Sequence, residues 1–183
     1  ANDSDPQSNM APSTLSILKT PTKGSAVVTT DFKILYTPTG NANGTDLLEY
    51  QVCDAQGYCS QASVNITIDA VNDNPTIVGD IASTNEDIAV LIDVLANDND
   101  NKDPIGGIDA ATIAIVTPPT KGVAVVELGK IKYTPNTNYN GSDVLTYKVN
   151  DKGNPLPALD GQATVTITID PVNDSPVISG QQT

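Results

Sequence analysis

Apolar and polar residues alternate in several short segments of the chain. Leu48, Tyr50 and Val52 are separated by polar residues, and residues 145–149 show the same alternation. A period of two places the apolar side chains on one face of an extended segment, which is typical of half-buried strands. We expect further strands at residues 26–28, 33–36, 63–68, 123–126, 130–133 and 164–169. No segment has the periodicity of an amphipathic helix, so the pattern predicts an all-β protein.

The sequence contains an internal repeat, in which segments of the first half recur in the second half after about a hundred residues. The matching segments are 1–5 and 96–100, 21–24 and 119–122, 36–38 and 133–135, and 43–46 and 140–143. Several short strands with turns between them, in a repeat of this length, predict a Greek-key β-sandwich. We therefore expect the 183 residues to form two such sandwiches in tandem. Tyr50 and Tyr147 hold matched positions, and we interpret both as core residues.

The two repeats differ at their N-terminal ends. Residues 76–78 and 88–95 are predicted as the first two strands of the second repeat, whereas the first repeat begins at Ala1 and lacks both. The missing strands either belong to sequence outside this chain or come from another chain that pairs with an exposed edge. We favour the first explanation, and we expect the first repeat to melt at a higher temperature when the missing residues are added.

The repeat also sets the predicted domain boundaries. A truncated first repeat covers residues 1–71, a linker residues 72–75, the second repeat residues 76–172, and the start of the next linker residues 173–183. Each linker closes with a proline, which prevents the preceding strand from continuing.

The chain is acidic, with a formal net charge of −13 and no His. We expect no nucleic-acid partner, because nucleic acids attract basic surfaces. No apolar run approaches the length of a membrane span, so membrane insertion is not expected either. The excess of carboxylates favours divalent cations as partners. Enzymatic activity is not expected, because His is absent as a base and no Ser lies in the context of a nucleophile.

Cys53 and Cys59 flank a five-residue loop between two predicted strands. This spacing suits a disulfide across a hairpin, and two free thiols are the alternative. A disulfide would place the protein in an oxidising compartment. Because the closed loop is short, the bond should add only about 2 kcal/mol or less to stability.

The first linker and its neighbouring loops carry the candidate chemistry. Calcium binds roughly six to eight oxygen atoms from carboxylates, carboxamides, carbonyls and water, and one linker cannot provide them all. The acidic loops of both repeats can complete such a site. The predicted ligands are Asp46, Asp69, Asn72, Asp73, Asn74, Asp98, Asp100 and Asp151. Asn, Asp and Pro are also common in ordinary turns, so the prediction depends on these segments taken together.

These segments resemble cadherin repeats in their bacterial form, the tandem cadherin-like domains of large cell-surface adhesins. Residues 72–75 are similar to the cadherin interdomain motif, residues 98–100 to its Asp-x-Asp motif, and residues 151–155 to its Asp-x-Gly-x-Pro stretch. The resemblance spans both repeats and implies Ig/cadherin-like sandwiches with calcium between them. It also implies that a glutamate near the first strand of a repeat contributes to the calcium site at the linker that follows that repeat. A second, partial metal site, expected to bind weakly, would then consist of Glu86, Asp143, Asn173 and Asp174.

The predicted function is that of calcium-binding repeats of an extracellular or cell-surface protein, which act as a calcium-stiffened stalk and in cell or matrix adhesion. The expected partners are calcium, further repeats of the same parent chain, and homophilic contacts or surface polysaccharide. The alternative is a polysaccharide-binding module of a secreted carbohydrate-active protein, with Tyr58 and Tyr139 as its aromatic residues. An aromatic content of 4 % makes such a platform small.

Overall fold

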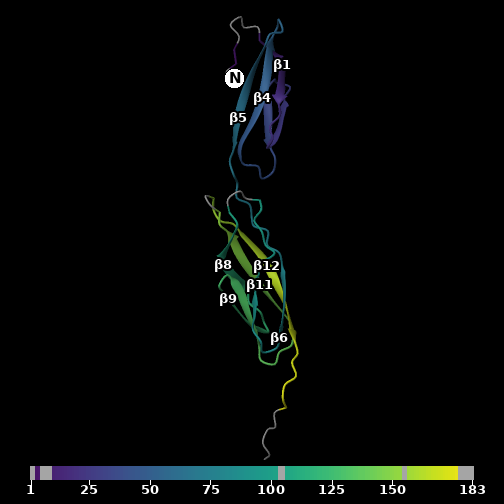
Figure 1. Ribbon diagram of the computed structural model, residues 1–183, viewed down its shortest axis with the longest axis vertical. Helices are drawn as coiled ribbons and strands as arrows, with labels where there is room; N and C mark the ends of the chain where they lie inside the picture. The colour runs from purple at the N-terminus through teal and green to yellow at the C-terminus, as the bar shows by residue number, and fades with distance from the viewer. Residues whose placement is uncertain (1–2, 5–9, 103–105, 154–155, 177–183) are drawn as a thin grey trace, which may run out of the picture. The chain divides into compact units, whose positions relative to one another are not determined.

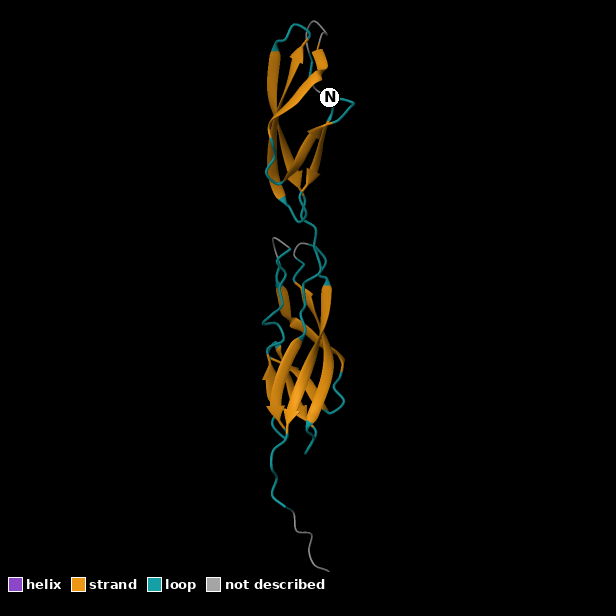
Figure 2. Cartoon of the chain, turned by 90° about the vertical axis from the view of Figure 1, so that its right-hand side faces the viewer, coloured by secondary structure: helices purple, strands orange, loops and turns teal. Residues whose placement is uncertain are grey.

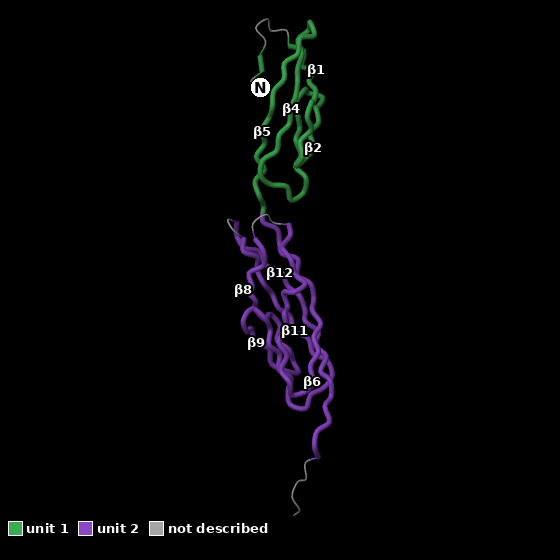
Figure 3. Tube along the Cα trace, viewed as in Figure 1, with its two compact units in different colours: residues 1–71 green, residues 72–183 purple. Residues whose placement is uncertain are grey.

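The computed structural model of the chain (Figure 1) describes residues 3–4, 10–102, 106–153 and 156–176. In these ranges the structure contains strands and loops but no helix (Figure 2), which confirms the predicted all-β fold. The chain divides into two compact units, residues 1–71 and 72–183 (Figure 3). Asn154 and Pro155 of the stretch 151–155, and the predicted linker beyond residue 176, lie outside the described residues.

The first unit is built from two antiparallel sheets. Its described strands are β1 (Met10–Lys19), β2 (Gly24–Val28), β3 (Ile34–Pro38), β4 (Gly44–Asp54) and β5 (Cys59–Ile68). β4 lies between β1 and β5, and β2 pairs with β3. Leu48 in β4 is 2 % exposed, and in the described part of this unit no other Val, Ile, Leu, Met, Phe or Tyr side chain is buried.

The second unit has the same strands and two more. The two additional strands are β6 (Asp80–Asn85) and β7 (Val90–Ile92). The strands that match those of the first unit are β8 (Ile108–Thr117), β9 (Gly122–Glu127), β10 (Lys130–Pro135), β11 (Gly141–Asp151) and β12 (Asp160–Asp170). One sheet has the order β6-β12-β11-β8 and the other the order β7-β10-β9. β6 runs parallel to β12, whereas the other pairs are antiparallel.

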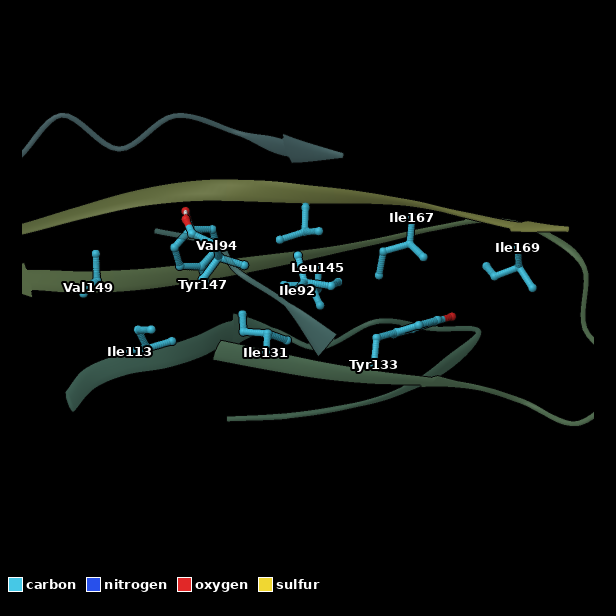
Figure 4. Close-up of a cluster of buried hydrophobic side chains, with 11 residues drawn as sticks. Ile92, Val94, Ile113, Ile131, Tyr133, Leu145, Tyr147, Val149, Ile167 and Ile169 are labelled. Carbon is cyan, nitrogen blue, oxygen red and sulfur yellow. Dashed lines mark hydrogen bonds between the residues drawn. The ribbon is translucent and has the colours of Figure 1, made fainter. Parts of the chain in front are cut away.

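The core of the second unit lies between its two sheets, where side chains from both meet (Figure 4). Ile131 and Tyr133 of β10, and Leu145 and Tyr147 of β11, are completely buried. The alternation in both strands therefore arises because one face of each strand is buried, and Tyr147 is a core residue as predicted. Tyr50, its counterpart in β4, is half-buried.

The start of the second unit differs from the prediction. Residues 76–78 do not form a strand. Within them only Thr76 pairs with another segment, through an isolated β-bridge to Asn99. The first strand is β6, whose sequence is polar and whose Ile81 is 87 % exposed. The second strand, expected at 88–95, is limited to Val90–Ile92. Periodicity did not reveal β6 because its position depends on parallel pairing with β12, far away in the sequence.

Candidate metal centre

Asp143, one of the predicted ligands, lies near the start of β11 and is 5 % exposed. Its Oδ1 accepts hydrogen bonds from the N–H groups of Thr120 at 3.0 Å and Val144 at 2.9 Å. Its Oδ2 accepts from the Lys121 N–H at 2.8 Å and the Tyr133 hydroxyl at 2.9 Å. Burial raises the pKa of Asp143, but the hydrogen bonds from Thr120 and Lys121 help to outweigh burial, so its pKa is lowered overall. We call this arrangement the carboxylate cradle.

The first unit repeats the carboxylate cradle around Asp46. The N–H groups of Thr22, Lys23 and Leu47 donate to its carboxylate at 2.9, 2.8 and 2.9 Å, and the Tyr36 hydroxyl donates at 2.9 Å. Burial alone would raise the pKa of Asp46, yet these donors lower it. The cradle explains why three separate segments of the sequence recur in both repeats.

A glycine follows the lysine of each cradle. A Cβ atom at Gly122 would lie 2.6 Å from the Tyr133 ring, and one at Gly24 would lie 2.6 Å from the Tyr36 ring. The tyrosine can therefore reach the carboxylate only beside a residue without a side chain. These contacts give Asp46 and Asp143 a structural task that the sequence did not reveal, and their part in binding metal stays a prediction.

Asp151, at the end of β11, meets the linker that enters the second unit. It is 1 % exposed, and its Oδ1 accepts a hydrogen bond from the Leu159 N–H at 3.1 Å. The carboxamide Nδ2 of Asn72 donates to Asp151 Oδ2 at 2.9 Å and to the Pro157 carbonyl at 3.0 Å. The structure thus brings together two predicted ligands that are 79 positions apart in the sequence. Asn74, two residues after Asn72, also binds the second unit: its Nδ2 donates to the Asp160 carbonyl at 2.8 Å.

The loop at residues 98–100 is tied to the same linker. Thr76 and Asn99 exchange backbone hydrogen bonds of 2.8 and 3.1 Å. Asp100 Oδ2 accepts from the Gly107 N–H at 3.0 Å, and the Gly107 carbonyl accepts from the Lys152 N–H at 3.0 Å. Because Lys152 follows Asp151 directly, this chain of contacts connects the Asp100 loop with the Asp151 loop.

Asp98 turns into the unit and forms an acidic pair that sequence analysis missed. Its Oδ1 accepts from the Val78 N–H at 2.7 Å and its Oδ2 from the Tyr147 hydroxyl at 3.1 Å. Within the described ranges, Oδ2 of Asp80 is buried without a hydrogen-bond partner. Burial, together with the negative charge of Asp98, raises the pKa of Asp80 to about 6. Burial also raises the pKa of Asp98.

We expect the second unit to lose stability as the pH rises through 6 in the absence of metal. Asp80 has a folded-state pKa of about 6, whereas an unfolded Asp has a pKa of about 3.9. Between these values the folded state holds a proton that the unfolded state releases, so the free energy of unfolding falls with rising pH. Melting curves of wild type and Asp80→Asn between about pH 4.5 and 8 should show a flatter profile for the variant.

The exposed residue Asp170 offers a control for this pH profile, since Asp170→Asn should keep the wild-type slope. Asp143, whose pKa is lowered, loses its stabilising charge only below about pH 4, outside the measured range. A wild-type slope in Asp80→Asn would show that other groups cause the dependence.

Glu86 contacts Val172, the residue directly before the linker that leaves the second unit. It is 5 % exposed, and its Oε1 accepts from the Val172 N–H at 2.6 Å. Its Oε2 accepts from the carboxamide of Asn140 at 3.4 Å, a contact that the sequence analysis missed although Asn140 belongs to a repeated segment. Asn173 and Asp174 are exposed. The structure thus places Glu86 beside the following linker, while the carboxylate of Asp143 is held in its own cradle.

No three acidic, His or Cys side chains among the described residues are grouped so that they could hold a metal ion by themselves. The groups at the linker end of the second unit are carboxylate, carboxamide and carbonyl oxygens, and this donor set fits a hard cation such as calcium. Asp46 and Asp69 belong to the first unit, where the Asp69 side chain is exposed.

Cys53 and Cys59 form a disulfide, as predicted, between directly opposed residues of β4 and β5. Tyr58, in the turn between them, is 79 % exposed. Tyr139 belongs to the other unit, where the Lys121 Nζ lies 5.6 Å from its ring centroid. The polysaccharide platform of these two tyrosines stays a prediction.

Comparisons with known proteins identify the fold. A family model described as a bacterial Ig domain matches residues 1–67 and 72–170. The fold is similar to protocadherin gamma B2 extracellular cadherin domains 3–6, with a TM-score of 0.53 and 13 % identity, covering 92 % of this chain and 43 % of that one. It is also similar to Drosophila N-cadherin EC1–4, with a TM-score of 0.51 and 17 % identity, covering 87 % and 40 %. No curated protein matches the sequence.

The chain spans less than half the length of these two cadherin structures, and the likeness concerns the fold alone. It confirms the predicted Ig/cadherin-like sandwiches. The described residues include no helix with the length and apolar character needed to cross a membrane. Because the family model covers nearly all of both units, the chain belongs to the family of bacterial Ig domains and contains two of them in tandem.

Proposed function

We infer that the chain is a pair of non-catalytic repeats from an extracellular or cell-surface protein, and that calcium binds where the linker enters the second unit. Bacterial Ig and cadherin domains are typically structural and adhesive modules, which supports the first part. The observation that carries the second part is the contact between the Asn72 carboxamide and the buried Asp151 carboxylate.

The charge of Asp151 needs compensation. A carboxylate that is 1 % exposed is costly to keep ionised unless a cation or several donors offset its charge. Its partners here, the Leu159 N–H and the Asn72 carboxamide, are neutral. A calcium ion bound there would supply positive charge beside Asp151, and the Asn72 carboxamide would present its oxygen to the ion after rotating.

The residues that would hold calcium are those at the linker end of the second unit. They are Asn72, Asp73, Asn74, Asp100 and Asp151, with Asp46 and Asp69 as proposed contributions from the first unit. Asp98 would join them only after its carboxylate leaves the Val78 N–H and the Tyr147 hydroxyl. Oxygen ligands, the absence of His and the pairing of both cysteines favour a hard ion over a transition metal. An ion with ligands from both repeats would restrain their relative motion, which is the basis for the proposed stiff stalk in adhesion.

Calcium should bind with the weak affinity of extracellular modules, a Kd of about 10⁻⁴ to 10⁻³ M. At 10 mM calcium this corresponds to roughly 1.4 to 2.7 kcal/mol of added stability in the second unit. Calorimetric titration measures the affinity and the number of ions, and melting curves measure the stabilisation. Magnesium at equal ionic strength is the control, and equal effects of both ions would contradict a dedicated calcium site.

The stiffening claim has its own measurement. Small-angle scattering of the chain should give a narrower distribution of interatomic distances in calcium than in chelator. If calorimetry detects calcium but the scattering curves coincide, the site is real and the stalk mechanism is wrong.

A further inference from the structure

The hairpin between β9 and β10 of the second unit ends in a turn that its sequence does not favour. The two residues of the turn are Leu128, with a φ of 52°, and Gly129, with a φ of 74°. A two-residue turn in which both φ angles are positive is of type I′, for which Asn-Gly is strongly preferred. In a leucine this left-handed conformation brings Cβ too close to the following carbonyl oxygen. The backbone at Leu128 is therefore strained.

Burial does not explain this strain, because the Leu128 side chain is 93 % exposed. The close contact with β8 is at the glycine, where an added Cβ would lie 3.3 Å from the Ala110 Cβ. The corresponding hairpin of the first unit, between β2 and β3, also has an apolar residue with a positive φ, Phe32 at 59°. A strained apolar residue at the same hairpin of both units indicates a task outside the fold.

Apolar surface continues from the turn over the outer face of the sheet β7-β10-β9. Leu91 of β7 is 51 % exposed, and Val123 and Val125 of β9 are 62 % and 49 % exposed. Lys132, which lies between two buried residues of β10, opposes Leu91 on one side and Val125 on the other. Residues that are directly opposed in neighbouring strands share one face of a sheet. We call Leu91, Val123, Val125 and Leu128 the hairpin surface.

The charges around the hairpin surface are balanced. Lys132 forms an ion pair with Glu127 at 3.3 Å, and Lys130 forms one with Asp93 at 2.8 Å. The chain as a whole has a net charge of −13, so two copies repel each other over most of their surfaces. Here two lysines match two carboxylates, and a two-fold axis could bring Glu127 of one copy to Lys132 of the other. The surface is therefore complementary in charge to itself.

We propose that two copies of the chain associate side by side through the hairpin surfaces of their second units. Leu128 of each copy would pack on the outer face of the other copy's sheet β7-β10-β9. The contact uses none of the residues proposed to hold calcium, and it goes beyond the proposed stalk because it would join neighbouring stalks laterally. A single contact of this size would be weak, but many of them along two parallel arrays would act together.

Sedimentation equilibrium of the whole chain in chelator, at concentrations up to about 1 mM, tests the proposal. We expect a concentration-dependent dimer. Leu128→Asn should weaken the dimer at least about tenfold, because two apolar side chains lose their burial. The same variant should raise the melting temperature of the second unit, since asparagine tolerates a positive φ, which separates lost association from lost folding. Ile81→Asn is the matched control, because Ile81 is 87 % exposed but lies in β6 of the other sheet. It should dimerise like the wild type.

A charge exchange identifies the occupant as a second copy. Lys132→Glu and Glu127→Lys should each weaken self-association about 2- to 5-fold, the size expected for an exposed ion pair. A mixture of the two variants should form mixed dimers with the wild-type affinity, because the opposite charges then face each other.

Several results would overturn the proposal. One is a chain that stays monomeric at about 1 mM, and another is a dimer that Leu128→Asn leaves unchanged or that Ile81→Asn weakens equally. Failure of the mixed variants to associate would exclude the proposed pairing of charges. If the monomeric chain bound uncharged phosphatidylcholine vesicles through Leu128, the occupant would be a lipid surface. Because all these measurements are made in chelator, their outcome is independent of the calcium site.

Discussion

Replacing Asp143 by alanine should lower the free energy of unfolding of the second unit by at least about 3 kcal/mol. The substitution removes the acceptor of five hydrogen bonds at a position that is 5 % exposed. The N–H groups of Thr120 and Lys121 would lose their acceptor, and the Tyr133 hydroxyl would remain in the interior without one. Denaturant unfolding of the second unit, in the presence of chelator, measures the loss.

Two variants make this result specific to the carboxylate cradle. Asp170→Ala removes an exposed carboxylate of the same unit and should change the stability by less than about 0.5 kcal/mol. Tyr133→Phe removes one donor and should cost about 1 kcal/mol. If Asp143→Ala were as stable as Asp170→Ala, the cradle would contribute nothing to the fold.

Asp151→Asn should reduce the stabilisation by calcium and should also destabilise the metal-free unit by about 1 to 3 kcal/mol. The new carboxamide has one oxygen for two donors, the Leu159 N–H and the Asn72 carboxamide, so one donor is left facing another. Loss of a negative ligand should weaken calcium binding by at least about tenfold. Melting curves with and without calcium separate the two effects.

Glu127→Gln is the matched control, because it removes one negative charge from an exposed ion pair with Lys132. Its calcium response should equal that of the wild type. A normal calcium response in Asp151→Asn would show that the ion binds elsewhere, and it would remove the main support for the proposed site.

Local pattern was sufficient for some strands and insufficient for others. β4 and β11 alternate regularly, because one face of each packs on a core, and both were predicted. β1 and β8 were not, because their pairing with β4 and β11 is interrupted by register shifts that break the period of two. β6 has a polar sequence and becomes a strand through its parallel partner β12, which no local rule can indicate.

The candidate site was predicted from residue types, which describe what a side chain can bind but not which groups surround it. Asn72 and Asp151 were expected near each other, and they are in contact. Asp80 was missed because its burial beside Asp98 and Tyr147 depends on tertiary packing. Asp143 was assigned to a partial metal site because a carboxylate suits either a cation or backbone N–H groups, and sequence alone does not distinguish these partners.

The carboxylate cradle has a consequence for how long arrays of these domains could change by recombination. Tyrosine and aspartate are separated by ten positions in both units. A crossover at the codons of Tyr36 and Tyr133 would thus join the first part of one repeat to the second part of the other. The number of residues between the tyrosine and the aspartate would stay the same. Hybrid domains produced in this way should retain the buried network, so unequal exchange can lengthen or shorten the array while each member still folds.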